Sequence, residues 1–186
     1  VDYREYLRAN IIAPLGLSDL RLGVAVQDQW DIAPLQCVGT PPTAVEIQAL
    51  FGSARDWRNA VDQSLLMFNE PEVRALGVPG GGAVSTAADM ALFYQPQVLA
   101  DATGRVRVEF ADPMTGAPAN YGLGVVIAGD DKYSPYRGMG TRVSGRAFGH
   151  QGIGGQVAWG DPVSGISFCL LTNGLDANPL RSAQLC

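Results

Sequence analysis

The sequence has one histidine, His150, and one lysine, Lys132, and it is poor in cysteine. Its three cysteines are odd in number and show no paired spacing: Cys37, Cys169 and Cys186. Neither a disulfide framework nor a zinc site is therefore expected, and the sequence predicts no metal ion and no cofactor.

Long apolar runs are also missing, because none approaches the ~18 residues needed to span a bilayer. The net charge of −5 argues against a nucleic-acid or anionic-membrane partner, which would require clustered positive charge. No signal peptide is visible, but the sequence opens with Val-Asp-Tyr, so this absence carries little weight. The cellular location is left open, with the bacterial cytoplasm slightly preferred to export.

The length of the chain, residues 1–186, fits one ordinary domain. Its hydrophobic content of 47% and charged content of 17% exclude a disordered class. With 23 glycines and 12 prolines, turns must be frequent. Helices are predicted at 2–13, 44–51, 57–68 and 86–95. Asp2 is expected to cap the first helix, and Thr86 with Asp89 matches a capping box at the last.

Two regions differ in how regular their patterns are. Residues 22–78 show poor periodicity and predict an irregular insertion, which either covers a binding site like a lid or is a simple surface excursion. Residues 121–173 carry the strands of a sheet, and alternation at 105–110 predicts one more. In the 148–173 stretch, runs at 153–159 and 166–171 flank Asp-Pro-Val-Ser-Gly and predict an antiparallel hairpin with a buried second strand.

The sequence contains only part of the residues that a hydrolase site requires. There is no G-x-S-x-G and no S-x-x-K, since Gly129 stands three residues before the only lysine. Ser85 and Thr86 are better explained by helix capping than as nucleophiles. His150 remains, in the glycine-rich string GHQGIGG at the predicted entrance of a hairpin strand. A lone histidine is by default structural, but glycines at a strand edge can present backbone N–H groups to an oxyanion.

Several stretches resemble one family, in the same order along the chain. FGHQGIGGQVAWGDPVSGISFCLLTNG resembles the H-x-G segment of the β-lactamase-related serine hydrolases, most like that of the bacterial carboxylesterases of this fold. YREYLRANIIAPLGLSDLRLG, FNEPEVRALGVPGGGAVSTAADMALFY and YGLGVVI resemble the family's Pro-Leu-Gly helix, its glycine-rich stretch with the following helix, and the strand before the H-x-G hairpin. The resemblance implies an α/β (α+β type) fold, a β-lactamase/transpeptidase-like antiparallel sheet flanked by helices.

The departure from the family is equally informative. Its nucleophile motif S-x-x-K and its tyrosine motif Y-x-N precede the Pro-Leu-Gly helix, and neither is present here. The resemblance therefore implies a C-terminal portion that needs an N-terminal segment, perhaps a separate chain, to complete the site. Without that segment, the sheet is expected to expose an edge and an apolar face.

Roles transfer to four residues. His150 stands where the family has the Lys or His of its third motif, which orients or polarises the substrate. Gly152 permits close approach, the backbone N–H of Ile153 is one of two oxyanion donors, and Gln151 either lines the pocket or points away. The implied substrate is a small ester, with a β-lactam as the alternative. The competing hypothesis is a non-catalytic scaffold of the same fold.

Overall fold

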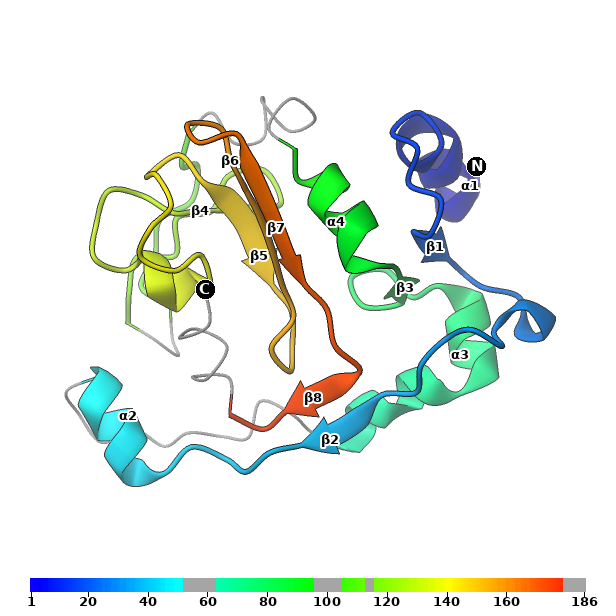
Figure 1. The fold of residues 1–186 in the computed structure, drawn as a ribbon, viewed down its shortest axis with the longest axis horizontal. Coiled ribbons are helices and arrows are strands. Elements are labelled where there is room, and N and C mark those ends of the chain that lie inside the picture. The colour runs from blue at the N-terminus through cyan, green and yellow to red at the C-terminus, as the bar shows by residue number, and fades with distance from the viewer. Residues whose placement is uncertain (52–62, 96–104, 113–115, 179–186) are drawn as a thin grey trace.

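The structure is a computed structural model that describes residues 1–51, 63–95, 105–112 and 116–178 (Figure 1). Its helices are α1 (Tyr3–Leu7), α2 (Ala44–Phe51), α3 (Pro71–Leu76) and α4 (Ala87–Phe93), the π-helical η1 (Arg8–Ile12), and the 3₁₀ helices η2 (Val26–Asp28), η3 (Gln63–Asn69) and η4 (Ser134–Arg137). Its strands are β1 (Arg21–Leu22), β2 (Gln36–Val38), β3 (Ala83–Val84), β4 (Val126–Ile127), β5 (Phe148–Gln151), β6 (Val157–Asp161), β7 (Ile166–Leu170) and β8 (Gly174–Asp176). Helices and antiparallel strands thus make the α/β fold that was expected.

The central sheet has four antiparallel strands in the order β4-β5-β6-β7. The predicted hairpin is confirmed as β6 and β7, joined through the turn that follows Asp161. One placement was wrong: His150 and Gln151 end β5 and do not open the first strand of that hairpin. The chain reverses at 152–156 into β6, so the glycine-rich string closes a second hairpin.

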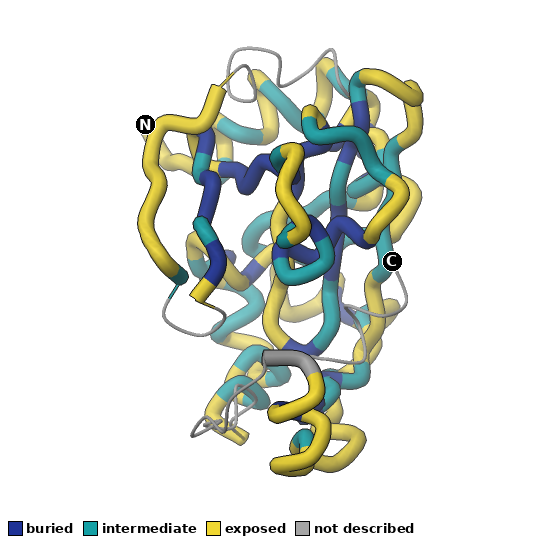
Figure 2. Tube along the Cα trace, turned by 90° about the vertical axis from the view of Figure 1, so that its left-hand side faces the viewer, coloured by how far each residue is buried: buried dark blue, intermediate teal, exposed yellow. Residues whose placement is uncertain are grey.

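Helix α4 covers one face of this sheet and builds the core there. Tyr94, the residue after α4, is buried with Phe148 and Ala158, and the rings of Tyr94 and Phe148 lie 6.2 Å apart between centroids. Gly160 allows this contact, because a Cβ at that position would lie 1.9 Å from the carbonyl oxygen of Tyr94. In Figure 1, α4 lies between the sheet and α1, and Figure 2 shows buried segments in dark blue against the yellow exposed ones.

Both predicted helix caps are present. The Asp2 carboxylate accepts from the N–H of Arg4 at 2.8 Å, and the Thr86 hydroxyl accepts from the N–H of Asp89 at 3.3 Å. Only half of the capping box forms. The Asp89 carboxylate instead accepts from the N–H groups of Asp19, at 2.6 Å, and Leu20, at 3.0 Å, and so ties α4 to the segment after η1.

The region 22–78 contains short elements attached to the rest of the fold. β1 pairs antiparallel with β3, and β2 pairs in parallel with β8. The predicted helix 44–51 is confirmed as α2, whereas 57–62 lies outside the described residues and η3 follows it as a 3₁₀ helix. That this region acts as a lid, and that the chain forms a single domain, both stay predictions.

Three strand expectations need correction. Residues 105–110 form no strand, only an isolated bridge between Val108 and Tyr121. The strand predicted at 121–127 shortens to β4, because the chain bends at 123–125, where the N–H of Gly122 donates to Val125 O at 2.8 Å. β7 is not buried: within the described residues it is an edge strand, and Ile166 is exposed.

Candidate functional site

The end of β5 is the centre of the candidate site. β4 pairs with β5 only at Phe148 and Gly149, so His150 and Gln151 project beyond it. On their other side, these two residues pair with Ala158 and Val157 of β6. One edge of the β5 end is therefore unpaired within the described residues, and both His150 and Gln151 are exposed there.

The imidazole of His150 contacts the backbone of its own strand. Its Nδ1 lies 2.5 Å from the carbonyl oxygen of Gln151. Because a carbonyl can only accept, a hydrogen bond at this contact requires the hydrogen on Nδ1. The ring of Tyr121 lies beside it, with 6.5 Å between the two ring centroids. His150 is thus held by its own strand and directs its second nitrogen away from Gln151.

The turn after β5 presents an unused backbone donor. The N–H of Gly152 donates to Gln156 O at 2.8 Å and closes the turn. Ile153 is 54% exposed, and its N–H bonds to no acceptor in the described part of the chain. An exposed N–H without a partner is the group required to stabilise an oxyanion.

The glycines of this turn also allow tight packing within the protein itself. A Cβ at Gly152 would lie 2.9 Å from the Cβ of Gln156. At Gly154, whose φ is +79°, a Cβ would lie 2.7 Å from the Cα of Leu175, and Gly154 O accepts from the N–H of Asp176 at 3.1 Å. The turn is therefore docked onto β8. The repeated glycines signal tight packing, but the sequence does not say against which strand.

Gln151 points toward the loop that precedes β5. A Cβ on Gly138 would lie 2.2 Å from Cγ of Gln151, so that side chain occupies the space over Gly138. Whether Gln151 lines a substrate pocket or points away from it stays a prediction. The sequence interpretation did not single out Gln156, whose side-chain amide makes two hydrogen bonds to the backbone of Thr172. Its Oε1 accepts from the N–H of Thr172 at 2.8 Å, and its Nε2 donates to the carbonyl oxygen of Thr172 at 2.9 Å.

A buried arginine fixes the loop around the site. Arg137 donates to Asp131 at 2.8 and 2.9 Å, and to the carbonyl oxygens of Pro118 and Ala128 at 2.5 Å each. The Arg137 bond holds the pKa of the Asp131 carboxyl below its usual range, which outweighs the opposing effect of burial. Arg137 therefore links Pro118 to Ala128, the two ends of the segment that carries Tyr121. Nothing in the sequence pattern had marked this residue.

A second cluster ties the same loop to β6. The Asp161 carboxylate accepts from the hydroxyl of Ser144 at 2.6 Å, from the N–H of Ser144 at 2.9 Å and from the N–H of Val163 at 2.9 Å. Burial, the largest single influence, raises the pKa of Asp161, but these donors together lower it below the usual value. The hydroxyl and the N–H of Ser144 are both bound to this carboxylate, so Ser144 anchors the loop to β6.

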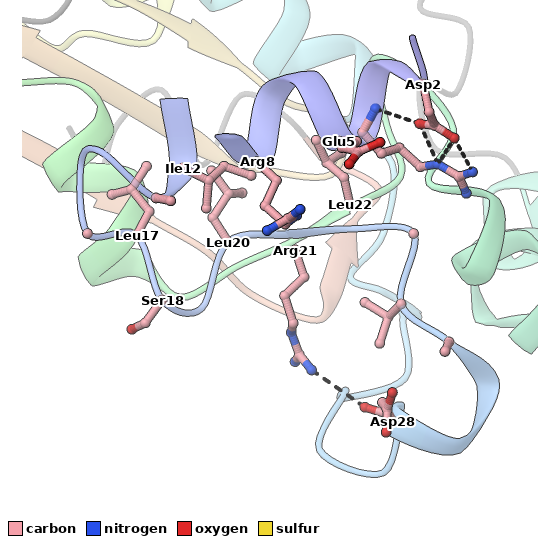
Figure 3. Close-up of a pocket in the computed structure, with 16 residues that line it drawn as sticks. Asp2, Glu5, Arg8, Ile12, Leu17, Ser18, Leu20, Arg21, Leu22 and Asp28 are labelled. Atoms are coloured by element: carbon pink, nitrogen blue, oxygen red, sulfur yellow. Dashed lines mark hydrogen bonds and ion pairs between the residues drawn. The ribbon is translucent and has the colours of Figure 1, made fainter. Parts of the chain in front are cut away.

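A cavity of about 870 Å³ lies elsewhere, between α1–η1 and the segment 16–28 (Figure 3). Some of the charged side chains on its wall form ion pairs: Arg4 with Asp2 at 2.6 Å, and Arg21 with Asp31 at 2.9 Å. No residue of 148–156 lines it. The cavity is therefore separate from the candidate site.

None of the helices in the described ranges is long and apolar enough to cross a membrane. The same ranges contain no group of three or more His, Cys, Asp or Glu side chains placed to hold a metal ion.

The chain matches known proteins over almost its whole length. The family profile described as Beta-lactamase matches residues 1–184. No match was found among the curated proteins. Among solved structures, a penicillin-binding protein homologue from Caulobacter crescentus is 23% identical with a TM-score of 0.63, and covers 98% of this chain and 50% of its own.

Two other structures share the fold. EstA from Arthrobacter nitroguajacolicus Rue61a is 17% identical, has a TM-score of 0.66, and covers 97% of this chain and 52% of its own. A beta-lactamase from Mycobacterium bovis is 23% identical, has a TM-score of 0.54, and covers 94% of this chain and 49% of its own. This chain thus spans about half the length of each structure that it matches.

Proposed function

Because this chain belongs to the beta-lactamase family, we propose that it supplies the oxyanion-side wall of a serine hydrolase that cleaves carboxylic esters through an acyl-enzyme. The observation that carries the proposal is the backbone N–H of the exposed residue Ile153, which bonds to no acceptor among the described residues and follows the end of β5 that β4 leaves unpaired. His150 and Gly152 stand immediately before this donor.

The chemistry follows from where charge develops. When a serine oxygen attacks the ester carbonyl, the carbonyl oxygen gains negative charge in the tetrahedral intermediate. The Ile153 N–H would donate to that oxygen, and removing one such donor typically costs about 3–4 kcal/mol of transition-state stabilisation. Nε2 of His150, free of the Gln151 bond, would orient the ester or accept a proton from the network.

The attacking serine must come from outside these 186 residues. The sequence has no S-x-x-K, and the chain spans about half of each matched structure. We therefore propose that a segment carrying S-x-x-K, as part of the same polypeptide or as a companion chain, completes the site. The isolated chain is then expected to leave p-nitrophenyl acetate unhydrolysed.

The test uses both the isolated chain and the protein purified from its source. Intact mass spectrometry identifies the polypeptide that carries this chain, or the companion that copurifies with it. A fluorophosphonate probe should label a serine in S-x-x-K of that material and none in the isolated chain. Saturable, probe-sensitive turnover by the isolated chain would contradict the proposed division of the site. A source protein that neither labels nor hydrolyses esters would support the scaffold hypothesis.

A further inference from the structure

Two aromatic side chains form a wall beside His150. The rings of Phe110 and Tyr121 are stacked, with 6.0 Å between centroids and an angle of 12° between planes. Tyr121 is in turn the aromatic neighbour of His150. The two rings come from segments joined by the isolated bridge between Val108 and Tyr121, so they extend away from the end of β5 as one surface.

The backbone beneath this wall is fixed by hydrogen bonds. Tyr121 N donates to Val108 O at 3.0 Å, and Tyr121 O accepts from the N–H groups of Arg107, at 2.7 Å, and Val108, at 3.1 Å. Ala119 N donates to Phe110 O at 2.9 Å. Arg137 secures the carbonyl of Pro118 on the same segment. A side chain on such a support is pre-organised, which lowers the entropy lost when it binds a ligand.

Within the described residues, part of this wall is exposed. Phe110 is 46% exposed, and Val108 and Leu123, from the same two segments, are exposed as well. Tyr121 is half-buried, and its hydroxyl makes no hydrogen bond to the described residues. An aromatic surface of this kind next to a polar group is the usual lining of a small-molecule site.

We propose that Phe110 and Tyr121 bind an apolar group, an aromatic ring or an alkyl chain, of the ester that is cleaved beside His150. They thereby set the preference of the enzyme for larger esters. This inference rests on the proposed hydrolase function for its substrate class. The contact of Tyr121 with His150 places the wall at the candidate site, and the charged cavity beside α1 lies elsewhere.

A binding experiment tests the wall without any turnover. Saturation-transfer NMR on the purified source protein compares phenylacetate with acetate, for the wild type and for the variants Tyr121→Ala and Phe110→Ala. Phenylacetate should receive saturation from the wild type, and either variant should weaken its binding roughly 3- to 10-fold, the loss expected for one aromatic contact. Tyr121→Phe should bind like the wild type. Tyr6→Ala, in the exposed part of α1, is the matched control.

A kinetic experiment on the purified source protein identifies which end of the ester the wall contacts. Contact with the acyl group is tested by the ratio of kcat/KM for p-nitrophenyl butyrate to kcat/KM for p-nitrophenyl acetate. Contact with the alcohol group is tested by the ratio of kcat/KM for phenyl acetate to kcat/KM for ethyl acetate. Tyr121→Ala should lower one ratio about 3- to 10-fold, and Tyr6→Ala neither.

The outcomes separate the two proposals. If phenylacetate does not bind, or if the variants bind it as the wild type does, the proposed role of Phe110 and Tyr121 in binding is wrong. Ester turnover with both ratios unchanged in Tyr121→Ala overturns it too, and leaves the hydrolase proposal intact. Binding that falls in the variants, in a protein without any ester turnover, keeps the wall as an apolar-ligand site and overturns the hydrolase proposal.

Discussion

Ser144 gives both its hydroxyl hydrogen and its backbone N–H to the carboxylate of Asp161, at 2.6 and 2.9 Å. The bond pair joins the loop before β5 to the last residue of β6. Asp161 is 3% exposed, so its carboxylate depends on these donors and on Val163 N in place of water. Ser144 and Asp161 thus anchor the loop before β5 at the end of β6 that lies away from His150.

Asp161→Asn should destabilise the fold by about 1–3 kcal/mol, because the amide nitrogen would face N–H donors and leave buried groups unpaired. The pKa of Asp161 is lowered in the folded state, so its stabilising contribution is present above the ordinary pKa near 3.8 and is lost as the pH falls below it. Urea unfolding at pH 7 and at pH 2.5 should show a large difference from the wild type at the first pH and a smaller one at the second. An equal difference at both pH values would contradict this account.

The thiol of Cys169 should resist alkylation. Burial raises its pKa to about 11 from the ordinary value of 9.0, and the thiolate is the reactive form. At pH 8 the thiolate fraction is then about 100-fold smaller than for an ordinary cysteine. In a Cys186→Ser background, iodoacetamide followed by peptide mass mapping should show that exposed Cys37 is modified first. In 6 M urea the two rates should become similar. Equal rates in the folded protein would show that Cys169 is not protected.

His150→Ala should lower kcat/KM for p-nitrophenyl acetate about 100-fold or more in the purified source protein, the usual size of a lost acid–base or orienting group. His150→Lys should recover part of that loss, since the family uses either residue in its third motif. Arg142→Ala, an exposed position in the loop before β5, is the control and should leave the rate unchanged. Thermal unfolding of each variant separates loss of activity from loss of fold. If the His150→Ala enzyme keeps its activity, His150 has no role in the reaction.

Gly160→Ala should cost about 1–3 kcal/mol in unfolding free energy, because the new Cβ would meet Tyr94 O, a backbone atom that cannot move without shifting the end of α4. Val163→Ala, at an exposed position in the next turn, should stay within about 0.5 kcal/mol of the wild type. Urea unfolding measures both. If Gly160→Ala is as stable as Val163→Ala, α4 does not depend on close approach to β6.

The sequence predicted elements best where a local rule acts. Asp2 and Thr86 were expected to cap their helices because Asp and Thr side chains satisfy the first free N–H groups, and both do. The turn at Asp161 was predicted from its residues for the same kind of reason. The alternation at 105–110 misled, because a polar–apolar pattern does not specify a pairing partner, and only isolated bridges form there.

The candidate site divides in the same way. The sequence alone determined that His150 and Ile153 lie in a glycine-rich string and that no S-x-x-K accompanies them, because these are properties of adjacent residues. Only the tertiary structure decided that β4 leaves His150 unpaired on one edge of β5, that Tyr121 lies beside it, and that Arg137 supports the intervening loop. These relationships join residues far apart in the chain, and they depend on strand register and on the burial of one guanidinium, which no local pattern encodes.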